Sequence, residues 1–493
     1  MSGTNLITVG VVGGYLLLVA LIGYYGYTRT GSETDFLVAG RDVGPFVGAG
    51  TLLASQISAS TLVGAIGIHY LYGIGFIWVW IGILAGWTVA FVFVAPQLRR
   101  FGGMTVPDFV GIRYADDGAD GDYARGVSAL LIVTVFTVFL AAQYTAGGLI
   151  FGELLGVSQT LGIYLTAVIA VTYTAFGGMR ASVLTDFVQA VVLVGGLVVV
   201  VPLALGAVGG PGALLSQLRA IDPSLVGQAL PLPKIGGFVL ASAVGIAAAP
   251  VEISRFYAMR DERTVRSAIQ LSLVAQGVIA LAVAALGLSA RVLFPELDVP
   301  DMAALVLSQE LLGPVLGTAF ILAILSAILS TTDSVLLVLS AGIAHDIYAG
   351  VFRPDASDRR TLRINRLAVP LVGLVPVVLA VFREFLGGLI TLITLLHLSL
   401  QGAMLFAPVL LGLHWRRATT AGGLGAMVAG FVTVVAWHVG TEVVRVVPEG
   451  LAASVGDPVV PGLVVSFATL AGLSLLTERP SVQSTSPFFS EGD

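Results

Sequence analysis

Long apolar segments, separated by short polar connections, follow one another along almost the whole chain. A helix needs roughly 20 apolar residues to cross about 30 Å of hydrocarbon. The segments are too long for barrel strands and lack their alternation of polar and apolar residues. The pattern therefore predicts an all-α polytopic membrane protein. It predicts thirteen spans: 5–27, 43–67, 70–97, 124–151, 157–176, 182–206, 234–254, 267–292, 313–343, 364–382, 387–412, 418–440 and 459–477.

The composition supports this prediction and narrows the function. Hydrophobic residues make up 57% of the chain and charged residues only 11%, whereas soluble domains carry about 25% charged residues. This balance excludes a nucleic-acid-binding protein. Because the chain has no cysteine and its five histidines are scattered, thiol catalysis and cysteine-held metal centres are excluded. No phosphate-binding loop motif occurs, so we expect neither an enzyme nor an organic cofactor.

The basic residues predict how the chain crosses the membrane. With the N-terminus outside, nineteen of the 24 Lys and Arg residues lie in the inner connections or the C-terminal tail. The other five lie outside: Arg219, Lys234, Arg291, Arg383 and Arg445. This split follows the positive-inside rule. We therefore expect a multi-pass plasma-membrane protein with a cytoplasmic C-terminus, an outer loop (207–233) that can hold a surface helix, and no obligatory protein partner.

A run of polar residues interrupts the second span. Ser55, Gln56, Ser58, Ser60 and Thr61 lie at membrane depth, where polar groups are costly and usually mark a site. Such a stretch can unwind where it lines a cavity, which frees backbone carbonyls for an ion. The alternative is an ordinary helix whose hydroxyls bond back to the preceding turn.

The ninth span contains a second polar cluster. Ser330, Thr331 and Thr332 precede Asp333 and Ser334 in the middle of a long apolar helix. Hydroxyl and carbonyl oxygens suit a hard cation such as Na⁺ in a weak, reversible site. Asp333 has no basic residue beside it in the sequence, so it needs a cation, a proton or hydroxyl donors around it.

Other polar residues are isolated within apolar segments. Asp186, at the start of the sixth span, either serves an ion site or pairs with Arg180. Glu252 and Arg255 follow Pro250, where the helix should break or end, and they could pair with each other. Mid-span Tyr144 and the pair His397 and Gln401, on one helix face, are further candidates, although a lone histidine is more often a satisfied interior residue.

Four motifs in order resemble the sodium:solute symporter family over residues 5–477. They begin with Ala54–Ala59 and continue with Phe176–Arg180 followed by Thr185–Gln189. Leu329–Ser334, with Asp346–Tyr348 after it, is similar to the family's "STADS…DIY", and Leu410–Trp415 to its "LLGLxW".

The resemblance implies a LeuT-like core of two inverted five-helix repeats, at 43–206 and 234–412. Residues 1–42 and 413–477 would be peripheral, and 478–493 a cytoplasmic tail. It also implies a sodium site made of five oxygen atoms: the carbonyls of Ala54, Ile57 and Ala327 and the hydroxyls of Ser330 and Thr331. Asp186 falls near the family's position for a further cation or proton, and Asp333 lies within a turn of the hydroxyls.

These observations predict a sodium-coupled symporter that imports a small organic solute through the bilayer. Family members that carry sugars have Glu and Gln where this chain has Ser60 and Thr61, which argues against a sugar. We expect a carboxylate such as proline or another amino acid, with pantothenate and short monocarboxylates as alternatives. Proton coupling through Asp186 or Asp333 is the rival mechanism. The candidate solute contacts are Gln56, Ser58, Tyr144, His397 and Gln401, with Tyr70, Tyr72, Trp78 and Trp80 at the mouth.

Overall fold

The computed structural model describes residues 6–115, 118–382, 390–480 and 485–489. Within these ranges the chain is helical, apart from turns and one isolated bridge between Val43 and Met259. This confirms the predicted all-α class. The predicted span 387–412 begins in residues that lie outside the described ranges.

The bundle consists of helices that pack side by side. They are α1 (Leu6–Arg29), α3 (Pro45–Gln56), α4 (Ala65–Tyr72), α5 (Ile77–Val89), α8 (Gly118–Leu155), α9 (Gln159–Ala207), α11 (Leu232–Ala247), α12 (Pro250–Ala258), α13 (Glu262–Leu293), α14 (Ala303–Ala341), α15 (Asp358–Val381), α16 (Ile390–His414), α17 (Thr420–His438) and α19 (Val459–Leu476). Shorter helices connect them: α2 (Glu33–Val38), α6 (Ala95–Phe101), α7 (Val106–Arg113), α10 (Pro211–Ile221) and α18 (Glu449–Val455). π-helical segments continue several of them: η2 (Ser60–Gly64), η4 (Ala90–Val94), η7 (Gly342–Phe352) and η9 (Val439–Val443).

Ten helical stretches among the described residues are long and apolar enough to cross a membrane. One of them, Gln159–Ala207, joins the predicted spans 157–176 and 182–206 into a single stretch. α1 is not among the ten, although it matches the predicted span 5–27. The predicted count of thirteen is therefore not confirmed, and it stays a prediction.

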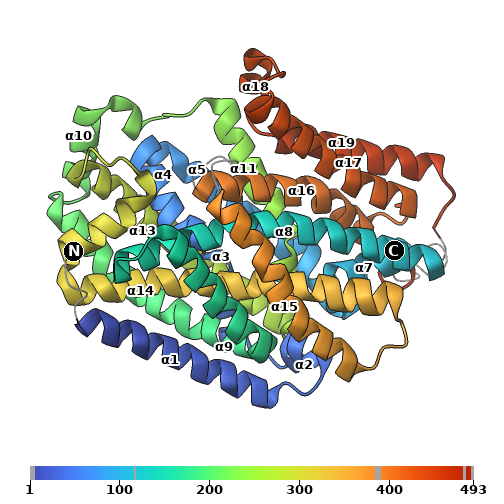
Figure 1. Cartoon of the computed structure of the whole chain (residues 1–493). Coiled ribbons are helices and arrows are strands. Elements are labelled where there is room, and N and C mark those ends of the chain that lie inside the picture. The colour runs from blue at the N-terminus through green and yellow to red at the C-terminus, as the bar shows by residue number, and fades with distance from the viewer. Residues whose placement is uncertain (1–5, 116–117, 383–389, 481–484, 490–493) are drawn as a thin grey trace.

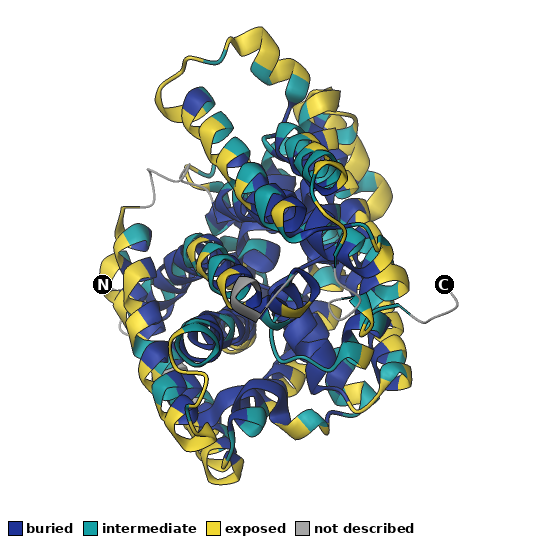
Figure 2. Ribbon diagram, turned by 90° about the vertical axis from the view of Figure 1, so that its right-hand side faces the viewer, coloured by how far each residue is buried: buried dark blue, intermediate teal, exposed yellow. Residues whose placement is uncertain are grey.

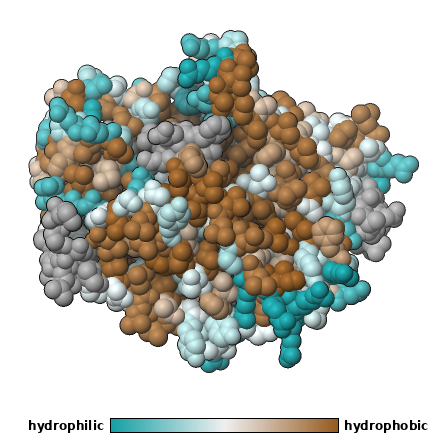
Figure 3. Space-filling model, viewed as in Figure 1, coloured by the Kyte–Doolittle hydropathy of each residue, from teal (hydrophilic) through white to brown (hydrophobic). Residues whose placement is uncertain are grey.

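The surface of the bundle is apolar where lipid would contact it. Val198 on α9, Leu281 on α13 and Leu371 on α15 are 68%, 67% and 64% exposed. Figure 3 shows hydrophobic residues gathered over the middle of one face and hydrophilic residues nearer its edges. Figure 2 shows that buried residues fill the interior. This distribution suits a chain whose outer surface faces hydrocarbon rather than water.

The two ends of the bundle differ in what they carry. In Figure 1, α1 begins at the left-hand end and α19 ends at the right-hand end. α10, the helix expected within 207–233, lies at the left-hand end, and α2 and α7 lie nearer the right. This arrangement agrees with termini on opposite sides of the membrane, whereas which side is outside stays a prediction.

Helix breaks occur at residues that favour them, namely a polar run, a proline and a glycine. α3 ends at Gln56, and Ile57 has extended backbone angles before helix resumes at η2. α11 ends at Ala247 and α12 starts at Pro250, which has no backbone N–H to continue α11. α9 bends at Gly178, whose φ of +58° suits glycine. The breaks in α3 and α11–α12 each lie in the first helix of a predicted repeat, and the repeat boundaries themselves stay predictions.

Candidate ion and solute site

The break after α3 faces a group of hydroxyls on α14. The Ser330 hydroxyl lies 3.3 Å from the Ala54 carbonyl oxygen, and the Thr331 hydroxyl lies 3.4 Å from the carbonyl oxygens of both Ala54 and Ile57. The same two hydroxyls lie 3.0 and 3.1 Å from the Ala327 carbonyl oxygen. The five oxygen atoms that the family resemblance singled out therefore form one cluster, which we call the oxygen cluster.

This cluster contains more acceptors than donors. Each hydroxyl has one hydrogen, yet three carbonyl oxygens face the pair, and both hydroxyls are already in reach of Ala327. In a continuous helix the amide of Ser58 would donate to the carbonyl of Ala54, but here it donates to Thr61 Oγ1. The break therefore leaves carbonyl dipoles available to a cation.

The spacing of the cluster fits a cation of the size of sodium. Oxygen ligands about 2.4 Å from Ca²⁺, whose radius is close to that of Na⁺, lie about 3.4 Å apart when they are at right angles. The contacts from Ser330 and Thr331 to the carbonyls of α3 span 3.3–3.4 Å, and those to the Ala327 carbonyl are shorter, at 3.0 and 3.1 Å. None of the five atoms is charged, which suits binding that must also reverse.

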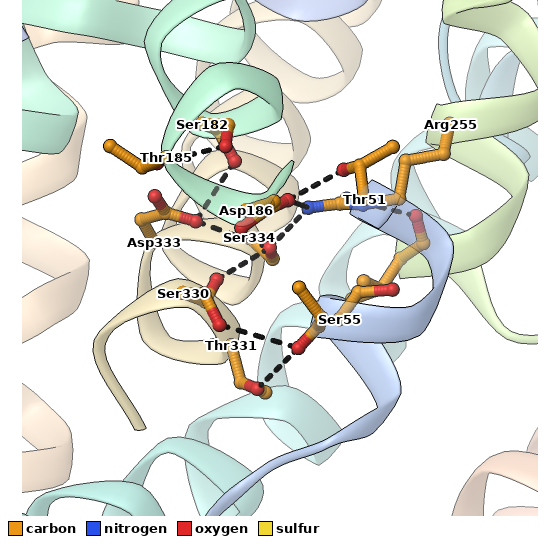
Figure 4. Close-up of polar contacts among 12 residues, drawn as sticks. Thr51, Ser55, Ser182, Thr185, Asp186, Arg255, Ser330, Thr331, Asp333 and Ser334 are labelled. Carbon is orange, nitrogen blue, oxygen red and sulfur yellow. Dashed lines mark hydrogen bonds and ion pairs between the residues drawn. The ribbon is translucent and has the colours of Figure 1, made fainter. Parts of the chain in front are cut away.

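A buried charged network adjoins this cluster, as Figure 4 shows. On α9, Asp186 accepts a hydrogen bond from Thr51 at 2.5 Å and pairs with Arg255 of α12 at 3.3 Å. Arg255 also donates to Ser334, whose hydroxyl lies 2.7 Å from the Ser330 carbonyl oxygen and 3.1 Å from Asp333. Ser182 donates to the same oxygen of Asp333 at 2.9 Å. The network thus joins α3, α9, α12 and α14 through two carboxylates and one guanidinium.

Two local pairings considered from the sequence are wrong. Arg180 does not pair with Asp186, because its guanidinium reaches Asp35 of α2 at 2.8 Å. Arg255 does not pair with Glu252 either, since it turns to Asp186. Arg255 was also counted among the inner loop residues, yet its side chain is fully buried. The helix continues through α12 after the break, which carries this arginine into the protein interior.

A cavity of about 90 Å³ lies beside the oxygen cluster. Thr331, a member of the cluster, is also one of the residues that line the cavity. Four of the five predicted solute contacts line it as well: Gln56, Ser58, His397 and Gln401. The fifth, Tyr144, is not among the lining residues that the structure describes. It is fully buried on α8, and its hydroxyl lies close to Gly373.

The aromatic residues expected at the mouth are dispersed. Trp80 lines the cavity, but Tyr70 is buried elsewhere, with its hydroxyl bonded to the carbonyl of Phe294 at 2.9 Å. Tyr72 lines a different pocket, and Trp78 is 53% exposed. Phe76, Phe136 and Phe139 line the cavity instead, and His397 stacks on Phe139 with centroids 4.6 Å apart.

The comparison with known families agrees with this geometry. Residues 36–430 match the model of the sodium:solute symporter family. The chain belongs to this family. The osmoregulated proline transporter OpuE of Bacillus subtilis is 30% identical over 495 residues, which cover 98% of this chain and 96% of OpuE. The high-affinity proline transporter PutP of the same organism is 30% identical over 480 residues, covering 95% and 98%. A sodium/proline symporter of Staphylococcus aureus is 30% identical over 484 residues, covering 94% and 92%.

Solved structures show the same fold at lower identity. An outward-open, substrate-bound Na⁺-coupled sialic acid symporter has a TM-score of 0.79 at 17% identity, covering 97% of this chain and 99% of its own. Mhp1, a nucleobase-cation-symport-1 family transporter, has a TM-score of 0.57 at 17% identity, covering 93% and 98%. These likenesses support the LeuT-like fold that the motifs implied.

Sequence reasoning about this symporter missed the role of Glu252 as a cavity residue. Its carboxylate lines the cavity, is 3% exposed and accepts a hydrogen bond from the Gln56 side chain. A signal was present, because a carboxylate two residues after a helix-breaking proline lies inside an apolar segment. Arg255, three residues later, offered a local ion-pair partner, so the sequence did not indicate that Glu252 faces a cavity.

A second ionic network lies at the end of the bundle that carries α2 and α7. Arg125 contacts Asp108 at 2.5 Å and Asp346 at 3.1 Å, while His345 lies between Glu33 at 2.8 Å and Asp108 at 3.1 Å. Burial raises the pKa of Asp108, but the hydrogen bond to His345 and the charges of His345 and Arg125 outweigh it, so its pKa lies below the usual value. Arg125 contacts both aspartates, so the network already contains a cation that the chain supplies.

Proposed function

We propose that this symporter couples the entry of Na⁺ to the import of a small carboxylate solute, of which proline or a related amino acid is the leading candidate. The observation that carries the proposal is the oxygen cluster, which shares Thr331 with the cavity. The cation and the solute would therefore bind side by side at the break in α3. Three relatives that are 30% identical over nearly their whole length are named as proline transporters, which supports the solute class.

Sodium is expected to bind first and to hold the broken helix against α14. The carbonyls of Ala54 and Ile57 belong to α3, and the hydroxyls of Ser330 and Thr331 belong to α14. A bound cation joins the two helices and thereby fixes Gln56 and Ser58 in the cavity wall. Because each ligand stabilises the same arrangement, each raises the affinity for the other by the same factor.

The solute carboxylate is expected to face the broken backbone and the cation. Unwound helices near the membrane midplane commonly bind anionic groups and ions in transporters of this kind. Alternating access would then carry both ligands inward, driven by the sodium gradient and by roughly 2.3 kcal/mol per charge for each 100 mV of membrane potential. Import into the cell follows from the inward sodium gradient, which sets the direction of net transport.

The charged network would couple the movements of α3, α9 and α12 during the transport cycle. Asp186 links α9 to Thr51 on α3 and to Arg255 on α12. One oxygen of Asp186 and one of Asp333 have no hydrogen-bond partner among the described residues. These oxygens favour a second candidate mechanism, in which a proton or a further cation binds at one of the two aspartates.

Uptake into liposomes that contain the purified protein tests the proposal. Labelled proline should accumulate when an inward sodium gradient is imposed at constant pH, and a proton gradient of the same size should not replace it. Unlabelled proline should compete more strongly than pantothenate, acetate, lactate or glucose. Glucose uptake without any carboxylate uptake would contradict the proposed solute class, and sodium-independent, proton-driven uptake would establish the second mechanism.

A further inference from the structure

Glu252 is a carboxylate in the cavity wall that the chain leaves without a counter-charge. One of its oxygens accepts the hydrogen bond from Gln56, and the other has no hydrogen-bond partner among the described residues. It forms no ion pair with any residue that the structure describes, because Arg255, the nearest basic residue in sequence, pairs with Asp186. The side chain is 3% exposed, so bulk water solvates it poorly.

A buried carboxylate in this position has two physical outcomes. It stays protonated, or it meets a cation that compensates for the water it has lost. The oxygen cluster supplies its own ligands to sodium and makes no hydrogen bond to Glu252. The solute is the other molecule that enters the cavity, and a positive charge on it would compensate the charge of Glu252.

The wall of the cavity also suits a positively charged group. Phe76, Trp80, Phe136 and Phe139 line it with aromatic rings. Aromatic faces attract ammonium groups, and more strongly so where water is excluded. The cavity wall thus combines one carboxylate, several aromatic rings and residues of the broken helix α3.

We propose that Glu252 is the counter-ion of a positively charged nitrogen on the solute. This inference rests on the proposed function and narrows it, because the solute then carries both a carboxylate and an ammonium group. Amino acids with a free or a methylated nitrogen, including proline and betaines, meet this requirement. Pantothenate, acetate and lactate carry no positive charge and would leave Glu252 unpaired, and a site built for a polar group strongly rejects an analogue that lacks it.

Pairs of ligands that differ at one atom or group test the inference directly. Proline is compared with tetrahydrofuran-2-carboxylate, in which a ring oxygen replaces the charged nitrogen. N,N-dimethylproline keeps the charge but has no N–H, so it separates charge from hydrogen bonding. Pyrrolidine keeps the nitrogen and has no carboxylate. Binding of each ligand is measured with purified full-length protein in two buffers. One buffer contains sodium, and the other contains neither sodium nor choline.

Three variants accompany these ligands. Glu252→Gln removes the charge and keeps the shape of the side chain, and Glu252→Asp keeps the charge on a shorter side chain. The matched control is Glu153→Gln, because Glu153 also accepts a hydrogen bond from a glutamine, Gln309, at an exposed place away from the cavity. Sodium binding in the absence of solute reports whether each variant is folded with an intact oxygen cluster.

In the wild type we expect proline and N,N-dimethylproline to bind at least tenfold more tightly than the oxygen analogue. Glu252→Gln should lower the affinity for both charged ligands at least tenfold, with little change for the oxygen analogue or for sodium. Glu252→Asp should retain part of the preference, and Glu153→Gln should retain all of it. Equal affinity for proline and its oxygen analogue in the wild type overturns the inference and leaves the proposed function standing.

The experiment also distinguishes the opposite case, in which the proposed solute class fails and the inference about Glu252 holds. If pyrrolidine binds in a Glu252-dependent manner while no carboxylate binds, the proposed solute class fails and the inference stands. If a Glu252→Gln protein that still binds sodium keeps the full preference for the charged member of each pair, the inference is wrong.

Discussion

Two helices of the bundle break beside the same cavity, and they do so with different chemistry. The break after α3 lies in a run of Ser, Gln and Thr residues and exposes the carbonyls of Ala54 and Ile57. The break between α11 and α12 lies between alanines and a proline, and it is followed by Glu252 and Arg255. The first break presents neutral backbone dipoles, whereas the second presents charged side chains.

This difference shows that an unwound helix does not by itself determine what binds there. Backbone carbonyls give a short-range, neutral set of ligands, which suits a small cation that must be released in every cycle. Side chains after the second break carry full charges, so each of them needs a partner in the protein or on the solute. Arg255 has its charged partner in Asp186, whereas Glu252 forms no ion pair with any described residue and one of its oxygens has no hydrogen-bond partner among them.

The largest effect should come from removing the charge that α12 carries into the bundle. Arg255→Leu leaves Asp186 and Asp333 buried together without a cation, which costs about 3–5 kcal/mol in comparable buried pairs. We expect a lower yield of folded protein and a lower Tm in detergent. Adding Asp186→Asn should recover much of the loss, because one unpaired carboxylate is then removed.

Arg180→Leu is the matched control for this prediction. Its ion pair with Asp35 is partly exposed, at 34% and 22% for the two side chains, so its loss should cost at most about 1 kcal/mol. If the Arg255 and Arg180 variants unfold at the same temperature, the charged network does not hold the second break as described.

The next largest effect should separate coupling from folding. Asp186→Asn keeps Asp333 near Arg255, so the protein should fold, but the link from α9 to α3 and α12 is weakened. We expect sodium-driven uptake to fall about tenfold or more, which corresponds to about 1.4 kcal/mol on the barrier, or the ratio of sodium to solute to change. Uptake and charge movement are measured together in proteoliposomes. Arg180→Ala should leave both unchanged, and an equal defect in that variant would refute the coupling role.

A smaller effect should follow from removing the hydroxyls that face the first break. Ser330→Ala with Thr331→Ala should raise the sodium concentration for half-maximal uptake several-fold or more, because the cation loses two ligands while its dehydration still costs the same. Thr332→Ala is the control, since this hydroxyl donates only within its own helix, to the Ile328 carbonyl at 2.7 Å. An unchanged sodium dependence in a folded double variant would exclude the oxygen cluster as the sodium site.

The smallest effect tests whether the first break acts through its backbone. Ile57→Val removes one buried methylene and should cost roughly 0.5–1.5 kcal/mol of stability, yet it keeps the carbonyl in place. The sodium concentration for half-maximal uptake should stay within about twofold of the wild type, because the charge and ligands of the site are unaltered. A large shift in a stable Ile57→Val protein would mean that the side chain, rather than the carbonyl, sets sodium affinity.

The sequence predicted those parts of the site whose signals are local. The length of the apolar segments predicted the helical bundle, and the polar run after Ala54 and the proline at 250 marked both breaks. The family motifs located the five oxygen atoms. The partner of Asp186 could not be predicted from the sequence, because Arg255 lies 69 positions away in the chain and contacts Asp186 only through tertiary packing.

The direction in which a mid-helix side chain points could not be predicted from the sequence either. Tyr144 and Gln401 are both polar residues inside apolar segments, but Gln401 lines the cavity and Tyr144 packs near Gly373. Which of them faces the cavity depends on how α8 and α16 rotate against their neighbours. Counting charges likewise placed Arg255 in a loop, because the sequence does not show that helix resumes after the break.

The backbone contribution of the first break bears on how such a transporter can change its cargo during evolution. Main-chain oxygens cannot be removed by substitution, so mutations at Ala54 or Ile57 that preserve the break leave these two of the five oxygen atoms in place. The side chains of Gln56 and Ser58 line the cavity, so substitutions there change the cavity wall without removing those carbonyls. A lineage can therefore exchange one solute for another by point mutation while it inherits the same means of harnessing an ion gradient.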